Sequence, residues 1–175
     1  IVAHKEKLLT QTWKPEAGKQ KAEIGVVVDP FIAKTFPDEL QANVQLLEKA
    51  GIEYEIVNCE QGSGAQLFEL GFWDLAKDIA EQNIQTITSG GYRTLLFLSH
   101  YDFKAFTNWY AEPGLQIPDI KAIPFPAYLT ELVRSGKLAF YKKKEGSVTY
   151  HDAAHFVRPQ SSFLEIGTLL EAVPE

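Results

Sequence analysis

The fold class is decided by the stretch AEIGVVVDP, residues 22–30. Its apolar run predicts a strand over Ala22–Val28, of the kind that a parallel sheet buries on both faces, and Asp29-Pro30 ends that strand. The periodicity of the rest predicts strands over 53–57 and 94–98, weaker strands over 120–124, 138–141 and 148–150, and helices over 37–50, 67–83, 101–110, 127–134 and 163–172. Because strands alternate with helices, we expect an α/β fold, a three-layer Rossmann-like domain with a mainly parallel sheet.

The length of 175 residues is typical of one domain. Residues 4–21 are polar, carry five lysines and contain Pro15 and Gly18. We therefore expect residues 1–21 to be an arm or linker and residues 22–175 to form the α/β domain.

The net charge of −6 argues against a nucleic-acid partner, because phosphate binding depends on clustered Lys and Arg. The short basic run Lys142-Lys143-Lys144 is expected to be a solvated turn. No apolar run approaches the ~18 to 20 residues of a membrane-spanning helix, so no transmembrane segment is predicted.

Cys59 is the only cysteine of the chain. One cysteine excludes an internal disulfide, and also a zinc or iron–sulfur site built from the thiolates of this chain alone. A lone free thiol fits the reducing cytosol better than a secreted disulfide scaffold, so we expect a cytoplasmic location.

Unusual residues occupy several loops that follow predicted strands. In an open parallel sheet, binding sites form in the loops at the carboxyl ends of the strands, so loops of this kind can converge on one site. The loops are Asp29-Pro30, Gly62-Ser63-Gly64, Ser99-His100-Tyr101-Asp102 and His151-Asp152-Ala153-Ala154-His155.

In order and spacing, these loops resemble the cysteine motifs of the CCG domain family, which occurs in heterodisulfide reductase and in the iron–sulfur subunits of glycolate and lactate oxidases. Gly62-Ser63-Gly64 stands where that family has Cys-Cys-Gly, and the segment 99–102 stands where it has Cys-x-x-Cys. The segment 148–155 is similar to the last motif of the family, and the first cysteine would fall near Asp29 or Pro30. The resemblance spans about residues 22–173.

The resemblance implies iron–sulfur clusters held by thiolates, yet the thiolates are missing. Glycine and alanine have no donor atoms, and serine and aspartate replace soft thiolates poorly. We therefore expect a cluster-free domain with no cofactor and no catalytic residue, in which Cys59, which lies off the motif, is a small buried residue near a strand end. The vacated cluster-ligand positions are Pro30, Gly62, Ser63, Ser99, Asp102 and Ala154.

The sequence thus favours a non-catalytic relative of heterodisulfide-reductase-type proteins that acts as a structural or docking component of a redox complex. Its protein partner would contact the arm or the aromatic segment 101–110, although aromatic residues at such spacing more often form core. One alternative is a part of an active iron–sulfur oxidoreductase whose clusters lie outside these residues. Another is a repurposed pocket that binds a metal or a small anion through His100, Asp102, His151, Asp152 and His155.

Overall fold

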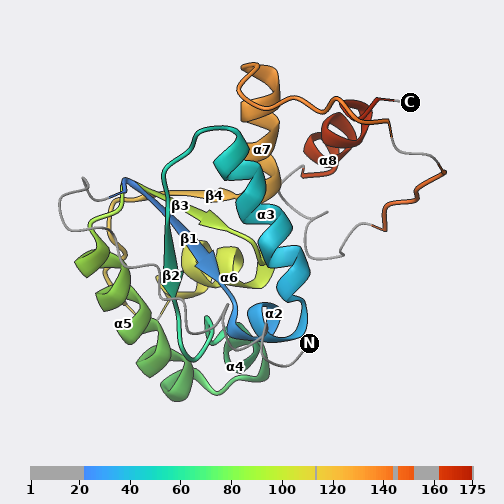
Figure 1. The fold of residues 1–175 in the computed structure, drawn as a ribbon. Coiled ribbons are helices and arrows are strands. Elements are labelled where there is room, and N and C mark those ends of the chain that lie inside the picture. The colour runs from blue at the N-terminus through green and yellow to red at the C-terminus, as the bar shows by residue number, and fades with distance from the viewer. Residues whose placement is uncertain (1–21, 113, 144–145, 152–161, 175) are drawn as a thin grey trace.

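The computed structural model describes residues 22–112, 114–143, 146–151 and 162–174 (Figure 1). Its strands are β1 (Ile24–Val28), β2 (Glu55–Asn58), β3 (Thr94–Phe97) and β4 (Lys121–Pro124). All pair in parallel, in the order β2-β1-β3-β4. In the register of the sheet, Val26 lies opposite Ile56 on one side and Leu96 on the other. The predicted α/β class with a parallel sheet is confirmed.

Helices connect every pair of consecutive strands. Between β1 and β2 lie α2 (Pro30–Thr35) and α3 (Pro37–Lys49), and between β2 and β3 lie α4 (Ala65–Leu70) and α5 (Trp73–Gly90). After β3 the chain forms α6 (His100–Lys104), which runs directly into the π-helix η1 (Ala105–Trp109). The helix α7 (Phe125–Arg134) follows β4, and α8 (Ser162–Glu171) lies near the C-terminus.

The sheet forms the middle of three layers. Side chains of a strand alternate between its two faces. On one face Val27, Leu95 and Phe97 pack against α4, α5 and the α6–η1 segment. On the other face Val26 and Leu96 pack against α3 and α7. Figure 1 shows α5 and α3 on opposite sides of the sheet, which confirms the predicted layers.

The helix predicted over 67–83 proves to be two helices. Gly71 ends α4 in the left-handed conformation, with φ of 82°, and α5 begins at Trp73 and continues to Gly90. The restart changes which residues face the sheet. Leu75 is 57% exposed, whereas Ala76 and Ala80 are buried.

The strands predicted over 138–141 and 148–150 are wrong. Leu138 is buried, but its backbone N–H bonds to the carbonyl of Leu132 in the turn that closes α7, so it is not available to a strand. Tyr141 and Val148 are exposed. A β-strand requires a neighbour for its backbone groups, and these apolar residues find none among the described strands.

Among the helices of the described residues, none combines the length and apolarity that crossing a bilayer requires. The predicted boundary between the arm and the domain falls next to residues 1–21, which lie outside the described residues.

Candidate functional site

The sheet reverses its winding direction at β1. The chain leaves β1 through α3 on one face to reach β2, and leaves β2 through α5 on the opposite face to reach β3. In open α/β sheets, ligands bind at such a switch point, beyond the carboxyl ends of the strands. The loops that follow β1, β2 and β3 meet at this place.

Asp29 and Pro30 begin α2 directly after β1. The Asp29 Oδ1 atom accepts hydrogen bonds from the backbone N–H of Phe31 at 2.6 Å and of Ile32 at 3.4 Å. Pro30 occupies the first turn, where a missing N–H costs nothing. A carboxylate at this position caps the helix and suits its dipole. Asp29 therefore caps α2, and Pro30, at the vacated ligand position, begins it, so both residues have a local structural role.

The loop after β2 places Ser63 inside the protein. The N–H of Gly62 bonds to the carbonyl of Cys59 at 2.8 Å, and Gly62 has a φ of 70°, a conformation that glycine adopts readily. A Cβ atom on Gly62 would lie 3.8 Å from the Asp29 Oδ2 atom, so this loop approaches the loop after β1. Ser63 is buried, and its Oγ accepts a bond from the N–H of Ala65 at 3.3 Å.

The loop after β3 places a carboxyl group in the interior. Ser99 caps α6 by accepting a hydrogen bond from the N–H of Asp102 at 3.4 Å. Asp102 is only 2% exposed, and neither of its carboxyl oxygens has a hydrogen-bond partner of standard geometry among the described residues. Buried polar atoms normally have partners, so this carboxyl group is an exception that invites explanation.

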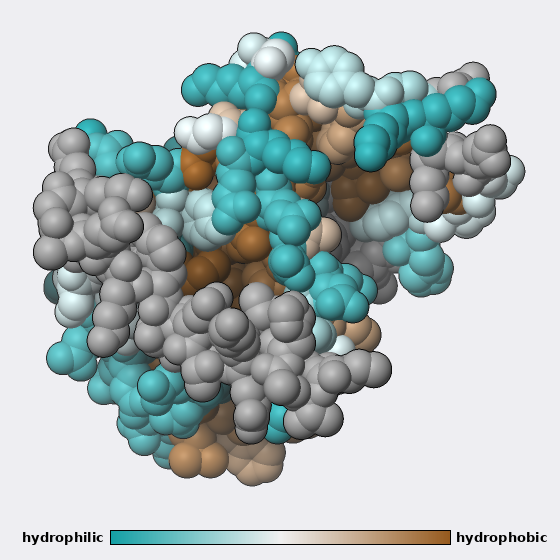
Figure 2. All heavy atoms as spheres, viewed as in Figure 1, coloured by the Kyte–Doolittle hydropathy of each residue, from teal (hydrophilic) through white to brown (hydrophobic). Residues whose placement is uncertain are grey.

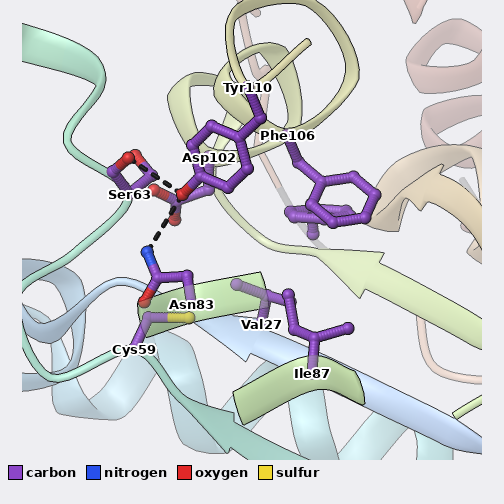
Figure 3. Close-up of a pocket in the computed structure, with 9 residues that line it drawn as sticks. Val27, Cys59, Ser63, Asn83, Ile87, Asp102, Phe106 and Tyr110 are labelled. Atoms are coloured by element: carbon purple, nitrogen blue, oxygen red, sulfur yellow. Dashed lines mark hydrogen bonds between the residues drawn. The ribbon is translucent and has the colours of Figure 1, made fainter. Parts of the chain in front are cut away.

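Asn83 and Tyr110 tie these loops together (Figure 3). The Tyr110 hydroxyl donates to the carbonyl of Ser63 at 2.9 Å. The Asn83 amide donates to the Tyr110 hydroxyl at 2.9 Å and to the carbonyl of Gly62 at 2.8 Å. Our sequence reasoning missed both residues. The available signal was Asn83 itself, an amide on the same face of α5 as the buried Ala76, Ala80 and Ile87.

A small cavity lies at the centre of this arrangement. Its volume is about 10 Å³, close to the smallest volume that holds one water molecule. Figure 3 shows the polar side chains gathered on one side of it and the apolar side chains on the other. The lining residues are Val27, Cys59, Ser63, Asn83, Ile87, Phe97, Asp102, Phe106 and Tyr110.

The environment of the cavity favours neutral forms of its acids. Burial raises the pKa of Asp102 to about 6, the nearby Asp29 carboxylate adds to the rise, and the hydroxyl groups of Ser63 and Ser99 oppose it in part. Burial also raises the pKa of the Cys59 thiol to about 12, again with contributions from the charges of Asp102 and Asp29. A thiol with so high a pKa is protonated at neutral pH, so Cys59 lacks the thiolate that a nucleophile needs.

The structure brings together four of the vacated positions, while the others lie apart or outside the described residues. Gly62, Ser63, Ser99 and Asp102 meet near the cavity, and Pro30 begins the neighbouring helix. Ala154 lies outside the described residues.

The candidate pocket residues are only partly described. His100 is the first residue of α6, half-buried, with its ring 6.4 Å from that of Phe103. His151 is exposed, and Asp152 and His155 lie outside the described residues. Within the described part of the chain, no three His, Cys, Asp or Glu side chains are grouped so as to hold a metal ion.

The aromatic segment 101–110 mostly forms core. Phe103, Phe106 and Tyr110 are buried, and Tyr101 and Trp109 are half-buried. The rings of Phe97 and Phe106 lie 5.4 Å apart. This packing leaves the segment little surface for a partner, contrary to one of the two contact regions that we considered.

Comparison with known proteins relates the chain to redox proteins. It is 26% identical over 138 residues to one subunit of the dihydromethanophenazine:CoB–CoM heterodisulfide reductase of Methanosarcina acetivorans. The matched residues make up 76% of this chain and 34% of that protein. It is 26% identical over 131 residues to the probable iron-sulfur-binding oxidoreductase FadF of Bacillus subtilis, covering 74% of this chain and 18% of that protein. The identity to one subunit of the fumarate reductase (CoM/CoB) of Methanothermobacter marburgensis is 22% over 153 residues, covering 87% and 30%.

The chain is a distant relative of iron–sulfur oxidoreductases. It spans about a third or less of the length of these relatives. No family model and no solved structure matches it. None of the names specifies the CCG domain, so membership of that narrower family remains a prediction.

Proposed function

We propose that this chain is a cluster-free structural or docking component of an iron–sulfur redox complex. The similarity to single subunits of heterodisulfide reductase and of fumarate reductase supports a place in such a complex. The proposal that the chain itself carries no cluster rests on the residues at the switch point of the sheet.

The observation that carries the proposal is the small cavity between the loops and the residues that line it. Iron–sulfur clusters are held by cysteine thiolates, with histidine in some cases. Where the resemblance places four of those ligands, the described residues offer a glycine, two serine hydroxyls and the carboxyl group of Asp102. The one cysteine of the chain, Cys59, is buried and lies outside those four positions. A cavity of about 10 Å³ has room for a group of about the size of one water molecule. These residues do not fit an iron–sulfur cluster.

Elemental analysis tests the cluster-free half of the proposal. The full chain is purified without oxygen, and iron, acid-labile sulfide and the visible spectrum are measured. We expect iron and sulfide far below one per chain and no broad visible absorption. Stoichiometric iron and sulfide, with the absorption of a cluster, would overturn it.

Co-purification tests the docking half. The tagged full chain is purified from its own cells, and we expect iron–sulfur subunits of one redox complex to co-elute with it in size-exclusion chromatography. A chain that elutes alone, under mild salt and without oxygen, would contradict this half of the proposal.

The second candidate function is a segment of an active oxidoreductase, and a specific observation favours it. The relatives named above carry iron–sulfur or reductase names and extend well beyond the part that this chain matches. Cysteine motifs encoded next to these residues would support that function, and their absence from the full reading frame would exclude it. A pocket that binds a metal or a small anion through His100, Asp102, His151, Asp152 and His155 stays a prediction. It requires that the metal content fall in His151→Ala and His155→Ala variants.

A further inference from the structure

An apolar patch lies on the surface where α4 ends and α5 begins. We call it the 70–75 turn. Within these six consecutive residues, Leu70 is 70% exposed, Phe72 54%, Leu75 57% and Trp73 40%. Figure 2 shows hydrophobic side chains gathered at the lower edge of the molecule, where α4 and the beginning of α5 lie in Figure 1. Isolated exposed apolar residues are ordinary, but a contiguous group of large ones often marks an interaction site.

Backbone hydrogen bonds fix the conformation of the turn that presents these side chains to solvent. Gly71 adopts the left-handed conformation that ends α4, and the N–H of Phe72 bonds to the carbonyl of Leu67 at 2.9 Å. Trp73 packs edge-on against Phe68, with ring centroids 5.3 Å apart, and Phe68 is buried against Tyr110. Exposure of the patch is therefore built into the fold. A preorganised surface also loses little entropy on binding.

The border of the patch carries two carboxylates that form no ion pair within the described part of the chain. The basic side chains nearby are already paired, Lys77 with Glu81 at 3.9 Å and Lys104 with Glu69 at 3.7 Å. Asp74 and Asp78, both exposed on α5, take part in none of the ion pairs among the described residues.

This charge pattern narrows the choice of occupant. In a symmetric dimer formed through the patch, the same surface would face itself, and the border carboxylates of both copies would be brought to one interface. Like charges placed across an interface suppress that pairing, whereas lysine or arginine on a different protein would complement them. The pattern therefore favours a partner other than a second copy of this chain.

We propose that the 70–75 turn, with Asp74 and Asp78 at its border, is the surface through which this chain docks onto another subunit of its redox complex. That subunit presents an apolar patch or helix face bordered by lysine or arginine. The inference rests on the proposed function and deepens it, since it names the contact surface and the chemistry of the partner. It also replaces the aromatic segment 101–110 as the region of contact. The surface adjoins the candidate site, because Phe68 links the turn to Tyr110.

The test compares two pairs of full-length variants. Leu70→Ser/Phe72→Ser/Leu75→Ser removes the apolar patch, and Tyr141→Ser/Val148→Ser is its control, since these residues are also exposed and apolar but lie elsewhere. Asp74→Lys/Asp78→Lys reverses the charge at the border, and Glu53→Lys/Asp119→Lys is its control on exposed loops. All the altered residues are exposed, and circular dichroism checks that each variant is folded.

The probe is the subunit that co-elutes with the wild-type chain, purified separately, and its affinity is measured by calorimetry at low and at high salt. We expect both patch variants to bind at least about tenfold more weakly, as hot-spot residues do, while both controls bind as the wild type does. Higher salt should weaken wild-type binding, because it screens the attraction, and should strengthen binding of the charge-reversed variant, because it screens the repulsion.

The outcomes separate this inference from the proposed function. If no subunit co-elutes with the wild type, the docking function fails and the inference fails with it. If the wild type binds and the patch variants bind equally well, only the inference fails. A dimer in sedimentation analysis that the patch variants lose would assign the surface to a second copy. An increase in apolar dye binding when residues 1–21 are deleted, lost again in the patch variant, would assign it to that segment. Either result would overturn the proposal.

Discussion

At the scale of single residues, Asp102 couples folding to pH. The pKa of its carboxyl group is about 6 in the folded protein, above the ordinary value of 3.8, so the folded state holds this proton more tightly than the unfolded state does. Proton binding by Asp102 therefore stabilises the folded state fully below pH 4, and this stabilisation is lost as the pH rises through about 6.

Asp102→Asn should remove this dependence. A difference of about 2 pKa units corresponds to roughly 2 to 3 kcal/mol. We expect the free energy of unfolding of the variant, relative to the wild type, to rise by that amount between pH 4 and pH 7. Urea titrations at several pH values measure it, with the exposed Asp119→Asn as control. Parallel profiles for the wild type and Asp102→Asn would show that this carboxyl group titrates as it does in water.

Cys59 should be inert in the folded protein. Its pKa of about 12 lies about three units above the ordinary thiol value of 9.0, so its thiolate fraction near pH 8 is lower by about a thousandfold. We expect a chromogenic disulfide reagent to label Cys59 only after urea unfolds the chain. Rapid stoichiometric labelling under native conditions would mean that the thiol is accessible and ionised.

At the scale of elements, the break between α4 and α5 depends on the backbone of Gly71. A Cβ atom there would meet nothing within 4 Å, so Gly71→Ala introduces no clash, yet the φ of 82° is unfavourable for alanine. We expect a loss of about 1 kcal/mol in the free energy of unfolding.

Gly167 offers a matched control, because a Cβ atom there also meets nothing within 4 Å but the residue lies inside α8. Gly167→Ala should stabilise the protein by about 0.5 to 1 kcal/mol, through helix propensity. Thermal and urea unfolding of both variants measure these opposite effects. If both substitutions shift stability in the same direction, backbone conformation does not explain the break.

The same break shows what could be predicted from the sequence. The short, continuous apolar runs at 24–28 and 94–97 predicted buried strands, and the structure has strands there. The loops that follow these strands carry residues that meet at the switch point. The end of α4 at Gly71 was missed because Leu67, Leu75 and Ile79 continue a helical pattern across it. Strands at 138–141 and 148–150 were mistaken because local pattern cannot reveal whether a neighbouring strand exists.

The sequence predicted which loops form the site, but not the hydrogen bonds that join those loops. The order of the loops along the chain predicted the convergence of Ser63 and Asp102, since a parallel sheet gathers its carboxyl ends at one edge. The bonds of Asn83 and Tyr110 join residues 27 and 47 positions apart. Contacts of that range depend on how α5 and η1 pack, which no local pattern contains.

At the scale of the whole molecule, the two apolar cores that the described residues form run from Ile24 to Leu169. On one face of the sheet, α8 completes the packing. Leu169 packs against the core, and the Thr130 hydroxyl donates to the carbonyl of Glu165 at 3.2 Å. The two ends of the chain should therefore differ in their effect on stability.

Deletion of residues 1–21 should leave one cooperative unfolding transition with its midpoint almost unchanged, as the predicted arm requires. Deletion of residues 162–175 should lower the midpoint by several degrees or more, because it uncovers the core under α7, and a loss of a few kcal/mol in a domain of this size has that effect. Calorimetry measures the unfolding midpoints of both truncated chains, with the full chain as the control. All three are prepared at equal purity and free of nucleic acid. A large loss of stability on deleting residues 1–21 would place part of the fold in that segment and would move the domain boundary that we assign at residue 22.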